Sequence, residues 1–310
     1  MTTISAKIVA DSYSEHGHRL TTLLLRYPRW IHAEGRTHRL LRIGEEEVWV
    51  EVRTPSVMED PNLSRNASSS RAIPVERLIE DVMRDPAVPM YWGANQRGMQ
   101  AGEECSEPVM IGLVNYEREA AWLRARNNAI ETARAFAEAG YHKQIVNRLL
   151  EPFSHINVVV TATEWTNFFA LRDHKDAEPH IRHLAIEMKK EMAASEPQIM
   201  VPGDWHLPFV LREERSLLTI EEQIGISVAR CARTSYRTHD GRHPDLTEDL
   251  RLARFLLAAT PLHASPAEHQ ATPDEPLIGD DEGVLAWKQA SKHGNLKGWV
   301  QYRKTLIGEC

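Results

Sequence analysis

The stretch Asn157-Val-Val-Val-Thr161 is short, uncharged and rich in β-branched residues, which favours a strand buried on both faces. Two segments with helical periodicity follow it, at 164–171 and 177–194. A second apolar strand is predicted at Arg19-Leu-Thr-Thr-Leu-Leu-Leu-Arg-Tyr27, where leucine and threonine dominate. We therefore expect an α+β protein with few strands and long helices.

The pattern of most other segments is helical. Pro28 and Pro74 each stand at the start of an apolar-periodic run, where the missing amide hydrogen of proline costs nothing. Gly140 follows an alanine-rich run and is expected to end it. Further helices are predicted at 28–41, 74–83, 107–139, 142–151, 221–235 and 246–259, and an acidic, proline-rich loop at 271–283.

The segment 196–220 is the best candidate for a linker, because two prolines and a glycine fall within Glu196–Asp204. It would join a part at 1–195 to a part at 221–310. Residues 40–63 are expected to be a surface insertion, because three consecutive glutamates precede the alternating Val48-Trp-Val-Glu-Val52, which is typical of a hairpin arm.

Composition excludes several classes of protein. The 310 residues include 37 Lys+Arg and 44 Asp+Glu, for a formal charge of −7. A protein that coats nucleic acid would be basic instead. No run approaches the ~18 apolar residues of a spanning helix, and Met1–Ser12 lacks the core of a signal peptide. We expect a cytoplasmic protein that binds neither a membrane nor nucleic acid.

Several common catalytic signatures are absent from the sequence. It contains no G-x-G-x-x-G after a strand, no G-x-x-x-x-G-K-[ST], no H-E-x-x-H and no G-x-S-x-G. Cys105, Cys231 and Cys310 are too far apart for a C-x-x-C site, so we expect free thiols. Histidines spaced three or four residues apart lack a supporting cluster of Cys or carboxylates, so no metal site is expected.

The loop Ser64-Arg-Asn-Ala-Ser-Ser-Ser-Arg71 combines four hydroxyls, an amide and two guanidiniums just before Pro74. Such donors converge naturally on a phosphate oxygen. Similar groups of donors occur at 34–39, 167–172, 233–235 and 263–269. Together they supply many hydrogen-bond donors and no obvious nucleophile, which fits an anionic cofactor that carries the chemistry itself.

These segments resemble the flavin-dependent (alternative) thymidylate synthases, whose signature is R-H-R followed by S-x-N-E-x-S-x-R. Thr37-His38-Arg39 resembles the first part, and the hydroxyls, amide and last arginine of Ser64–Arg71 fall on the second. Arg233-Thr-Ser235 is similar to the family's A-R-x-S turn, and His263–His269 to its H-x-T-P-F-E-H turn.

The order of these segments differs from the ordinary family, in which the A-R-x-S and H-x-T-P-F-E-H turns come before R-H-R. Here they come last, so the chain resembles a circularly permuted member of the type that viruses encode. The resemblance implies a small antiparallel sheet with long helices, in which 1–195 binds the nucleotide and 221–310 completes the flavin site. Thr37 replaces the first arginine of R-H-R, and Ala67 replaces the glutamate of the second motif.

The resemblance implies transfer of a one-carbon unit from methylenetetrahydrofolate to C5 of a deoxypyrimidine monophosphate, with dUMP converted to dTMP. FAD would supply the hydride after reduction by NADPH, and family members are homotetramers with sites built from several subunits. The implied catalytic residues are Arg172 and Arg71. The implied substrate-binding residues are Glu34, Ser69, Arg71, Arg148, Arg172 and Glu178. The implied cofactor-binding residues are Thr37, His38, Arg39, Asn66, Asn167, Arg233, Ser235, His263 and Ser265.

Glu178 stands where the family has a glutamine, and this leaves the substrate open. An ionised carboxylate only accepts hydrogen bonds, so it would suit the amino group of cytosine better than O4 of uracil. Glu178 could instead pair with Arg182 one turn later. The alternatives are a methylase or hydroxymethylase of dUMP or dCMP that serves viral DNA modification, a non-catalytic flavin- or nucleotide-binding relic, and a helical interaction protein.

Overall fold

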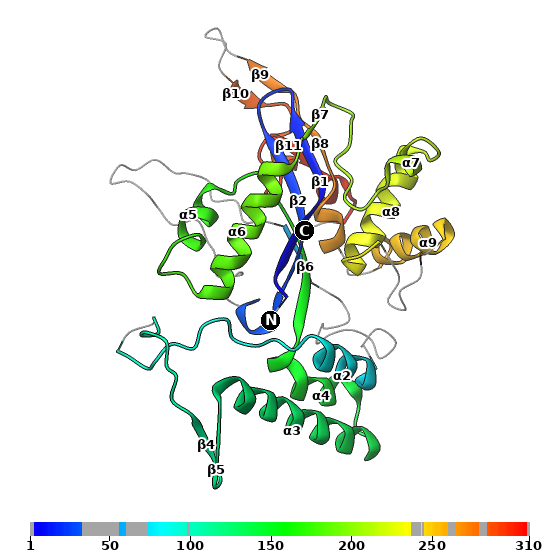
Figure 1. Ribbon diagram of the computed structural model, residues 1–310. Helices are drawn as coiled ribbons and strands as arrows, with labels where there is room; N and C mark the ends of the chain where they lie inside the picture. Colours follow the sequence, from blue (N-terminus) through cyan, green and yellow to red (C-terminus); the bar gives the residue numbers. More distant parts are fainter. Residues whose placement is uncertain are drawn as a thin grey trace.

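Two antiparallel strands, β2 (Arg19–Pro28) and β6 (His155–Ala162), form the centre of a five-stranded sheet (Figure 1). The computed structural model describes residues 3–32, 56–59, 74–97, 100–236, 243, 245–259, 264–278 and 284–308. The other strands of the sheet are β1 (Ser5–Ser14), β3 (Ser56–Glu59) and β7 (Gln198–Met200), in the order β3-β6-β2-β1-β7. All neighbours are antiparallel except β7, which pairs parallel to β1.

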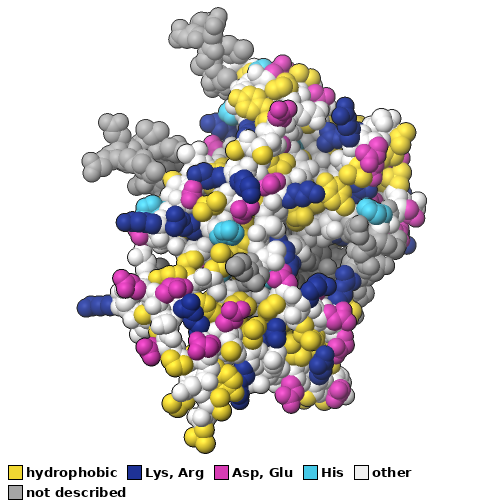
Figure 2. Space-filling model, in the orientation of Figure 1, with side chains coloured by type: hydrophobic (Ala, Val, Ile, Leu, Met, Phe, Trp, Pro, Cys, Tyr) yellow, Lys and Arg dark blue, Asp and Glu magenta, His cyan; other side chains and the backbone are white. Residues whose placement is uncertain are grey.

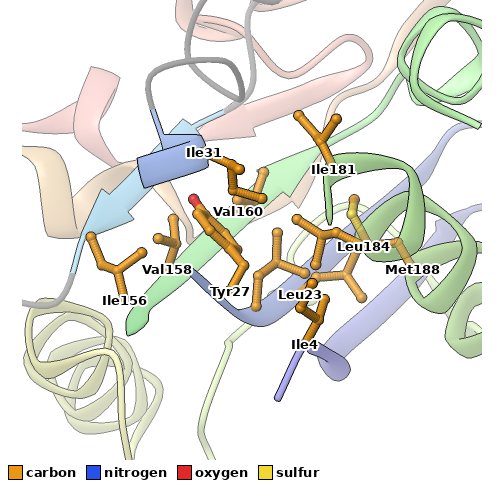
Figure 3. Packing of buried hydrophobic residues seen from close by; sticks show 11 residues of the cluster. Ile4, Leu23, Tyr27, Ile31, Ile156, Val158, Val160, Ile181, Leu184 and Met188 are labelled. Carbon is orange, nitrogen blue, oxygen red and sulfur yellow. The ribbon is translucent and has the colours of Figure 1, made fainter. Parts of the chain in front are cut away.

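One face of the sheet is covered by α5 (Thr166–Arg172) and α6 (Pro179–Ala194). Leu23 and Val158 of the sheet meet Leu184 and Met188 of α6 in an apolar cluster (Figure 3). We call this the apolar face. Alternate residues of β2 point toward it, which is why a strand buried on both sides still has a two-residue period.

The opposite face is covered by the C-terminal part of the chain. Its helices are α7 (Arg212–Arg215), α8 (Ile220–Arg233) and α9 (Leu246–Leu257), with the 3-10 turn η4 (Ser265–Glu268) packed against α8. Two small sheets complete it: β8 (Ala271–Pro273) with β11 (Trp299–Gln301), and β9 (Pro276–Ile278) with β10 (Val284–Trp287). Because threonine and histidine side chains meet on this side, we call it the polar face.

A helical layer lies below the sheet in Figure 1. It contains α2 (Val75–Arg84), α3 (Arg118–Glu138), α4 (Lys143–Val146) and η3 (Asn147–Phe153), which share an apolar cluster of their own. The hairpin β4 (Val109–Ile111) and β5 (Val114–Tyr116) projects from this layer. Its tip is apolar on the surface (Figure 2), and Leu113 is fully exposed.

The α+β class predicted from the sequence is confirmed, as are the strands at 19–27 and 157–161 and most of the helices. The helix expected at 107–139 begins only at Arg118, because Gly112 turns the preceding residues into a hairpin with a φ of +67°. The loop expected at 271–283 contains β8 and β9. The helix expected at 28–41 is the 3-10 turn η1 (Arg29–Ile31) where it is described, and 33–41 lies outside the described residues.

The segment 196–220, expected as a linker, contributes β7 to the main sheet and buries Leu207 and Phe209 almost completely. The division of the chain at this segment stays a prediction. The insertion expected at 40–63 is described only at β3, so its role stays a prediction too. Among the described helices, none is long and apolar enough to cross a membrane.

Candidate functional site

Eight of the residues that the resemblance implies for the site lie outside the described residues. They are Glu34, Thr37, His38, Arg39, Asn66, Ser69, Arg71 and His263. The described candidates fall into three groups, on α5 and α6, on η3, and on α8 with η4.

The first group begins with α5, which presses its aromatic side chains onto the apolar face. Phe168 and Phe169 pack against the cluster there, and the Trp165 ring stacks on Phe169 at 6.1 Å between centroids. The indole Nε1 of Trp165 and the Nδ2 of Asn167 are buried, and neither has a hydrogen-bond partner among the described residues. A buried unsatisfied donor costs about 1–3 kcal/mol, so this short helix holds two donors that an acceptor atom of a ligand would stabilise.

Arg172 is the last residue of α5 and is partly buried. Its position at the C-terminal end of the helix places a cation where the helix dipole is negative. Asp173, the next residue, is held by Lys189 at 2.7 Å from Nζ to Oδ2. A guanidinium here can accompany a ligand that carries or develops negative charge.

Glu178 is the N-cap of α6, and its carboxylate is already engaged. Oε2 accepts the backbone N–H of His180 at 2.9 Å and of Ile181 at 3.0 Å. The Nε2 of His180 accepts the backbone N–H of Met90 at 2.9 Å, so a neutral ring carries its proton on Nδ1 and donates it to Glu178 Oε1. Three N–H groups therefore hold Glu178. The pairing with Arg182 that the sequence left open is replaced by this helix cap.

Arg148 forms the second group by itself. It lies on η3 in the helical layer and is exposed. Nearby in the same layer, Glu151 pairs with Arg29 at 3.3 Å. The Arg148 side chain is thus exposed to solvent, and it lies in a different layer of the fold from α5.

The third group lies at the end of α8, where a buried ionic network holds its arginines. Arg230 binds both oxygens of Glu214, at 2.6 and 2.7 Å, and donates from Nε to Asp249 Oδ2 at 3.0 Å. Arg233 pairs with the other oxygen of Asp249, which is itself fully buried. The charge of Arg233 is therefore balanced within the protein, whereas its Nε is buried and has no acceptor among the residues described.

Ser235 follows directly, after Thr234 has ended α8 in the left-handed region with a φ of +52°. Ser265 begins η4 and is exposed. Because α8 and η4 share one apolar cluster, these two serines belong to neighbouring turns on the polar face. The structure thus brings Arg233, Ser235 and Ser265 into one region, as expected, but places the sheet between them and α5.

The sequence analysis missed a buried polar cluster on the polar face, formed by Ser12, Thr22, Thr161, His206 and His269. All five side chains are at most 1% exposed. Ser12 Oγ contacts His206 Nδ1 at 2.8 Å, and His206 Nε2 contacts Thr22 Oγ1 at 2.8 Å. Thr22 and Thr161 share a bond of 2.7 Å between their hydroxyls, and Thr161 Oγ1 contacts His269 Nδ1 at 2.8 Å.

Both histidines in this cluster are neutral. Burial lowers the pKa of His206 to about 3, with a smaller effect from the nearby Arg215 cation. Burial alone lowers the pKa of His269 to about 3. Within the described part of the chain, the Nε2 of His269 has no hydrogen-bond partner. Two members of the cluster lay in segments that the sequence analysis had singled out: Thr161 in the predicted strand and His269 at the end of the 263–269 turn. His206 could not be linked to them, because it is remote from both in the chain.

Two cysteines are described and neither is placed as a nucleophile. Cys231 is completely buried on the polar face, and burial raises the pKa of its thiol above its usual value. Cys105 is half-buried and free. Among the described residues, no group of three or more His, Cys, Asp or Glu could hold a metal ion.

Comparisons with known proteins found one matching family model, which covers residues 55–198. This segment matches the model of the thymidylate synthase complementing protein (Thy1) family. No curated protein matches the chain in sequence. Among solved structures, the chain is similar to the UMP/dUMP methylase PolB from Streptomyces cacaoi bound with 5-Br UMP, at 16% identity over 62% of this chain and 90% of that one, with a TM-score of 0.41. The same protein bound with 5-Br dUMP gives 15% identity, 62% and 91% coverage, and a TM-score of 0.40.

Proposed function

Because residues 55–198 match the model of the thymidylate synthase complementing protein family, we propose that the chain is a member of that family and transfers a one-carbon unit from methylenetetrahydrofolate to C5 of dUMP, giving dTMP. The observation that carries the proposal is the content of the matched segment. It includes the Ser64–Arg71 loop, Arg148, and the helix that bears Asn167 and Arg172. The circular permutation and the virus type are part of the same proposal. The segments that resemble the A-R-x-S and H-x-T-P-F-E-H turns belong to α8 and η4, which follow the matched segment.

The described residues fit a cofactor that is rich in acceptor atoms. Trp165 Nε1, Asn167 Nδ2 and Arg233 Nε are buried donors that find no acceptor in the described ranges of the chain. Phosphate and carbonyl oxygens of FAD are acceptors that would satisfy such donors. In this proposal FAD supplies the hydride and is itself reduced by NADPH. Asn167, Arg233, Ser235 and Ser265 would hold it, together with Thr37, His38, Arg39, Asn66 and His263.

The protein's own part in the reaction is electrostatic. Arg172 would place a cation against the negative charge that develops on the pyrimidine ring when the ring is activated for attack by C5, which lowers the energy of the transition state. Ser69, Arg71 and Arg148 would hold the 5′-phosphate. The burial of Cys231 supports a route without a thiol nucleophile, because that thiol stays protonated and out of reach of substrate.

The geometry of Glu178 favours dUMP over dCMP. The case for cytosine required a carboxylate free to accept from the exocyclic amino group. In this chain the carboxylate already accepts three N–H groups at the start of α6. The dCMP methylase or hydroxymethylase is therefore the second candidate.

We further propose that one site combines residues of more than one copy, in a homotetramer. Arg172 and Asn167 lie with α5 on the apolar face, whereas Ser235 and Ser265 lie on the polar face, with the sheet between them (Figure 1). A single flavin site that contains both groups is most simply assembled from two chains.

The first experiment is anaerobic turnover with FAD, NADPH and methylenetetrahydrofolate, offering dUMP and dCMP separately. A product heavier than dUMP by one CH₂ supports the proposal. A gain of CH₂O, or any product from dCMP, would shift the function to the second candidate. A protein that binds flavin and gives no product would be a non-catalytic relic.

A mixing experiment tests the shared site. Arg172→Ala removes the cation of α5, and Ser265→Asp puts a negative charge on η4 that repels an anionic cofactor. Each variant alone should be nearly inactive, and mixed oligomers should recover a fraction of the activity, because some sites then receive both intact groups. If native mass spectrometry shows mixed oligomers without recovery, the site lies within one chain.

A further inference from the structure

The buried cluster of the polar face is a linear chain of hydrogen bonds. Its order is Ser12, His206, Thr22, Thr161 and His269, with contacts of 2.7 to 2.8 Å throughout. Its members come from β1, from the stretch after β7, from β2, from β6 and from the end of η4. This chain of hydrogen bonds thus crosses the polar face from β1, the neighbour of the edge strand β7, to η4, the turn that carries Ser265.

The number of protons available to these five side chains allows two arrangements of donors and acceptors. Each hydroxyl carries one proton, and each ring carries one because both histidines are neutral. If Thr22 donates to Thr161, then Thr161 must donate to His269 Nδ1, and His206 must donate to Thr22 from Nε2. If Thr161 donates to Thr22 instead, every bond is reversed.

These arrangements fix the two imidazoles together. In the first, both His206 and His269 carry the proton on Nε2, and Ser12 donates to His206 Nδ1. In the second, both carry it on Nδ1, and the Ser12 hydroxyl is left to find another acceptor. A mixed pair of tautomers would break at least one bond, at a cost of about 1–3 kcal/mol for the buried group left unsatisfied.

We propose that His206 and His269 share one tautomer, and that His269 Nε2–H donates to an acceptor oxygen of the ligand bound at η4. This rests on the proposed function, which places a phosphate- and carbonyl-bearing cofactor at the same turn. His269 Nε2 is fully buried and has no hydrogen-bond partner among the residues that the structure describes. In the first arrangement this atom is an N–H without an acceptor, and a ligand oxygen removes that cost.

The ligand therefore selects the first arrangement, and its effect reaches the far end of the chain. His206, Thr22 and Ser12 act as positioning residues, because they reach the ligand only through Thr161 and His269. Phe209 and Val159 belong to an apolar cluster on the same face of the sheet. While the ligand is bound, this arrangement of hydrogen bonds keeps the Nε2 of His269 a donor and not an acceptor.

The tautomers can be measured directly by two-bond ¹H–¹⁵N spectra of protein labelled with ¹⁵N-histidine, at neutral pH, with and without FAD. His206→Gln and His269→Gln assign the two rings. We expect the same tautomer in both rings under each condition, and the Nε2–H form in both with FAD bound. Opposite tautomers would overturn the coupling, and Nδ1–H forms with FAD bound would overturn the contact to the ligand.

Binding of FAD is followed separately by quenching of its fluorescence, so the two proposals fail in different ways. Without quenching, the proposed cofactor is wrong, and the ligand contact fails with it. The agreement between tautomers in the free protein still tests the coupling in that case.

Thr161→Val breaks the chain between the two histidines. We expect the tautomer of His206 to become insensitive to FAD, and the affinity for FAD to fall by about tenfold, since one hydrogen bond loses its fixed polarity. Thr161→Ser should restore both properties. A His206 that still responds to FAD in Thr161→Val would overturn the coupling.

Thr21→Val is the matched control. Thr21 is as buried as Thr161 and lies on the neighbouring strand β2, where it donates to Asp11 Oδ1 at 3.0 Å, but it points away from the hydrogen-bond chain. This variant should lose stability to a similar degree while keeping the response of His206 to FAD.

Discussion

Thr22 and Leu23 are neighbours on β2, and both are completely buried, yet they belong to opposite kinds of surroundings. Leu23 enters the apolar cluster with α6 (Figure 3), where contacts have no direction and the stabilisation grows with the area removed from water. Thr22 must satisfy its hydroxyl, and it does so with two partners remote in sequence. Leu23 on the apolar face therefore stabilises the fold through the area it buries, whereas Thr22 on the polar face fixes the directions of hydrogen bonds.

The largest expected loss of stability is on the polar face, at Asp249. Asp249→Asn would leave the Arg233 cation without a charged partner and Arg230 with one instead of two. We expect a loss of about 3–5 kcal/mol in the free energy of unfolding, because an uncompensated buried charge is costly. Denaturant unfolding measures it.

The control is Asp173→Asn, which breaks the exposed pair with Lys189 and should leave stability unchanged. An equal effect of the two substitutions would contradict the role of burial.

On the apolar side, Leu184→Ala should cost about 2–5 kcal/mol, because it removes buried methyl groups and leaves a cavity beside β2. Ile186→Ala, two residues along the same helix and 40% exposed, should cost much less. Unfolding of both variants by denaturant gives the comparison. A small effect at Leu184 would mean that the cluster is not the source of stability.

A third prediction concerns pH and is tested at the two histidines of the polar face. Burial also lowers the pKa of His155, at the start of β6, to about 4, so that ring adds to the same trend. The folded pKa is about 3 for His206 and His269, below the unfolded value of about 6.5. The unfolded chain therefore takes up protons first as the pH falls, and stability decreases by about 1.4 kcal/mol per pH unit for each ring below that value. Stability at neutral pH is the reference.

Urea unfolding at neutral pH and at about pH 5 tests this linkage. His269→Gln should reduce the slope, whereas His174→Gln, at an exposed histidine, should not. A flat profile in the wild-type protein would show that the two rings are not buried as neutral groups.

The smallest expected effect is at Glu178. Glu178→Gln keeps the size of the cap but weakens the bonds to the helix N-terminus and to His180, for a loss of about 1 kcal/mol. The preference between dUMP and dCMP should not change, because the carboxylate serves α6 and not the base. A reversed preference in turnover assays would return Glu178 to the substrate.

Much of the secondary structure could be predicted from local pattern, and the exceptions have local causes. Strand β6 and helix α2 lie where the β-branched run and Pro74 place them. Strand β1 was missed because its register shifts between Ile8 and Ala10, which breaks the two-residue alternation that marks a strand. The hairpin before α3 was missed because its two strands have three residues each.

The candidate site was less predictable, because its residues acquire their roles from distant partners. The sequence analysis predicted Arg233 and Glu178 as ligand contacts. The structure shows that Arg233 also pairs with Asp249 and that Glu178 is the N-cap of α6. Their contacts with ligand stay predictions. Nothing near His206 in the sequence marks it as the neighbour of Thr22, which lies 184 residues away.

The sequence by itself determined the α+β class, the apolar strands at the centre, the helix starts and the family-like segments, because each depends on residues close together in the chain. Only the tertiary structure decided which candidates share a face, which charges are balanced and which donors stay unsatisfied. Those properties depend on contacts between remote segments, and on the loss of water around them, which no local pattern encodes.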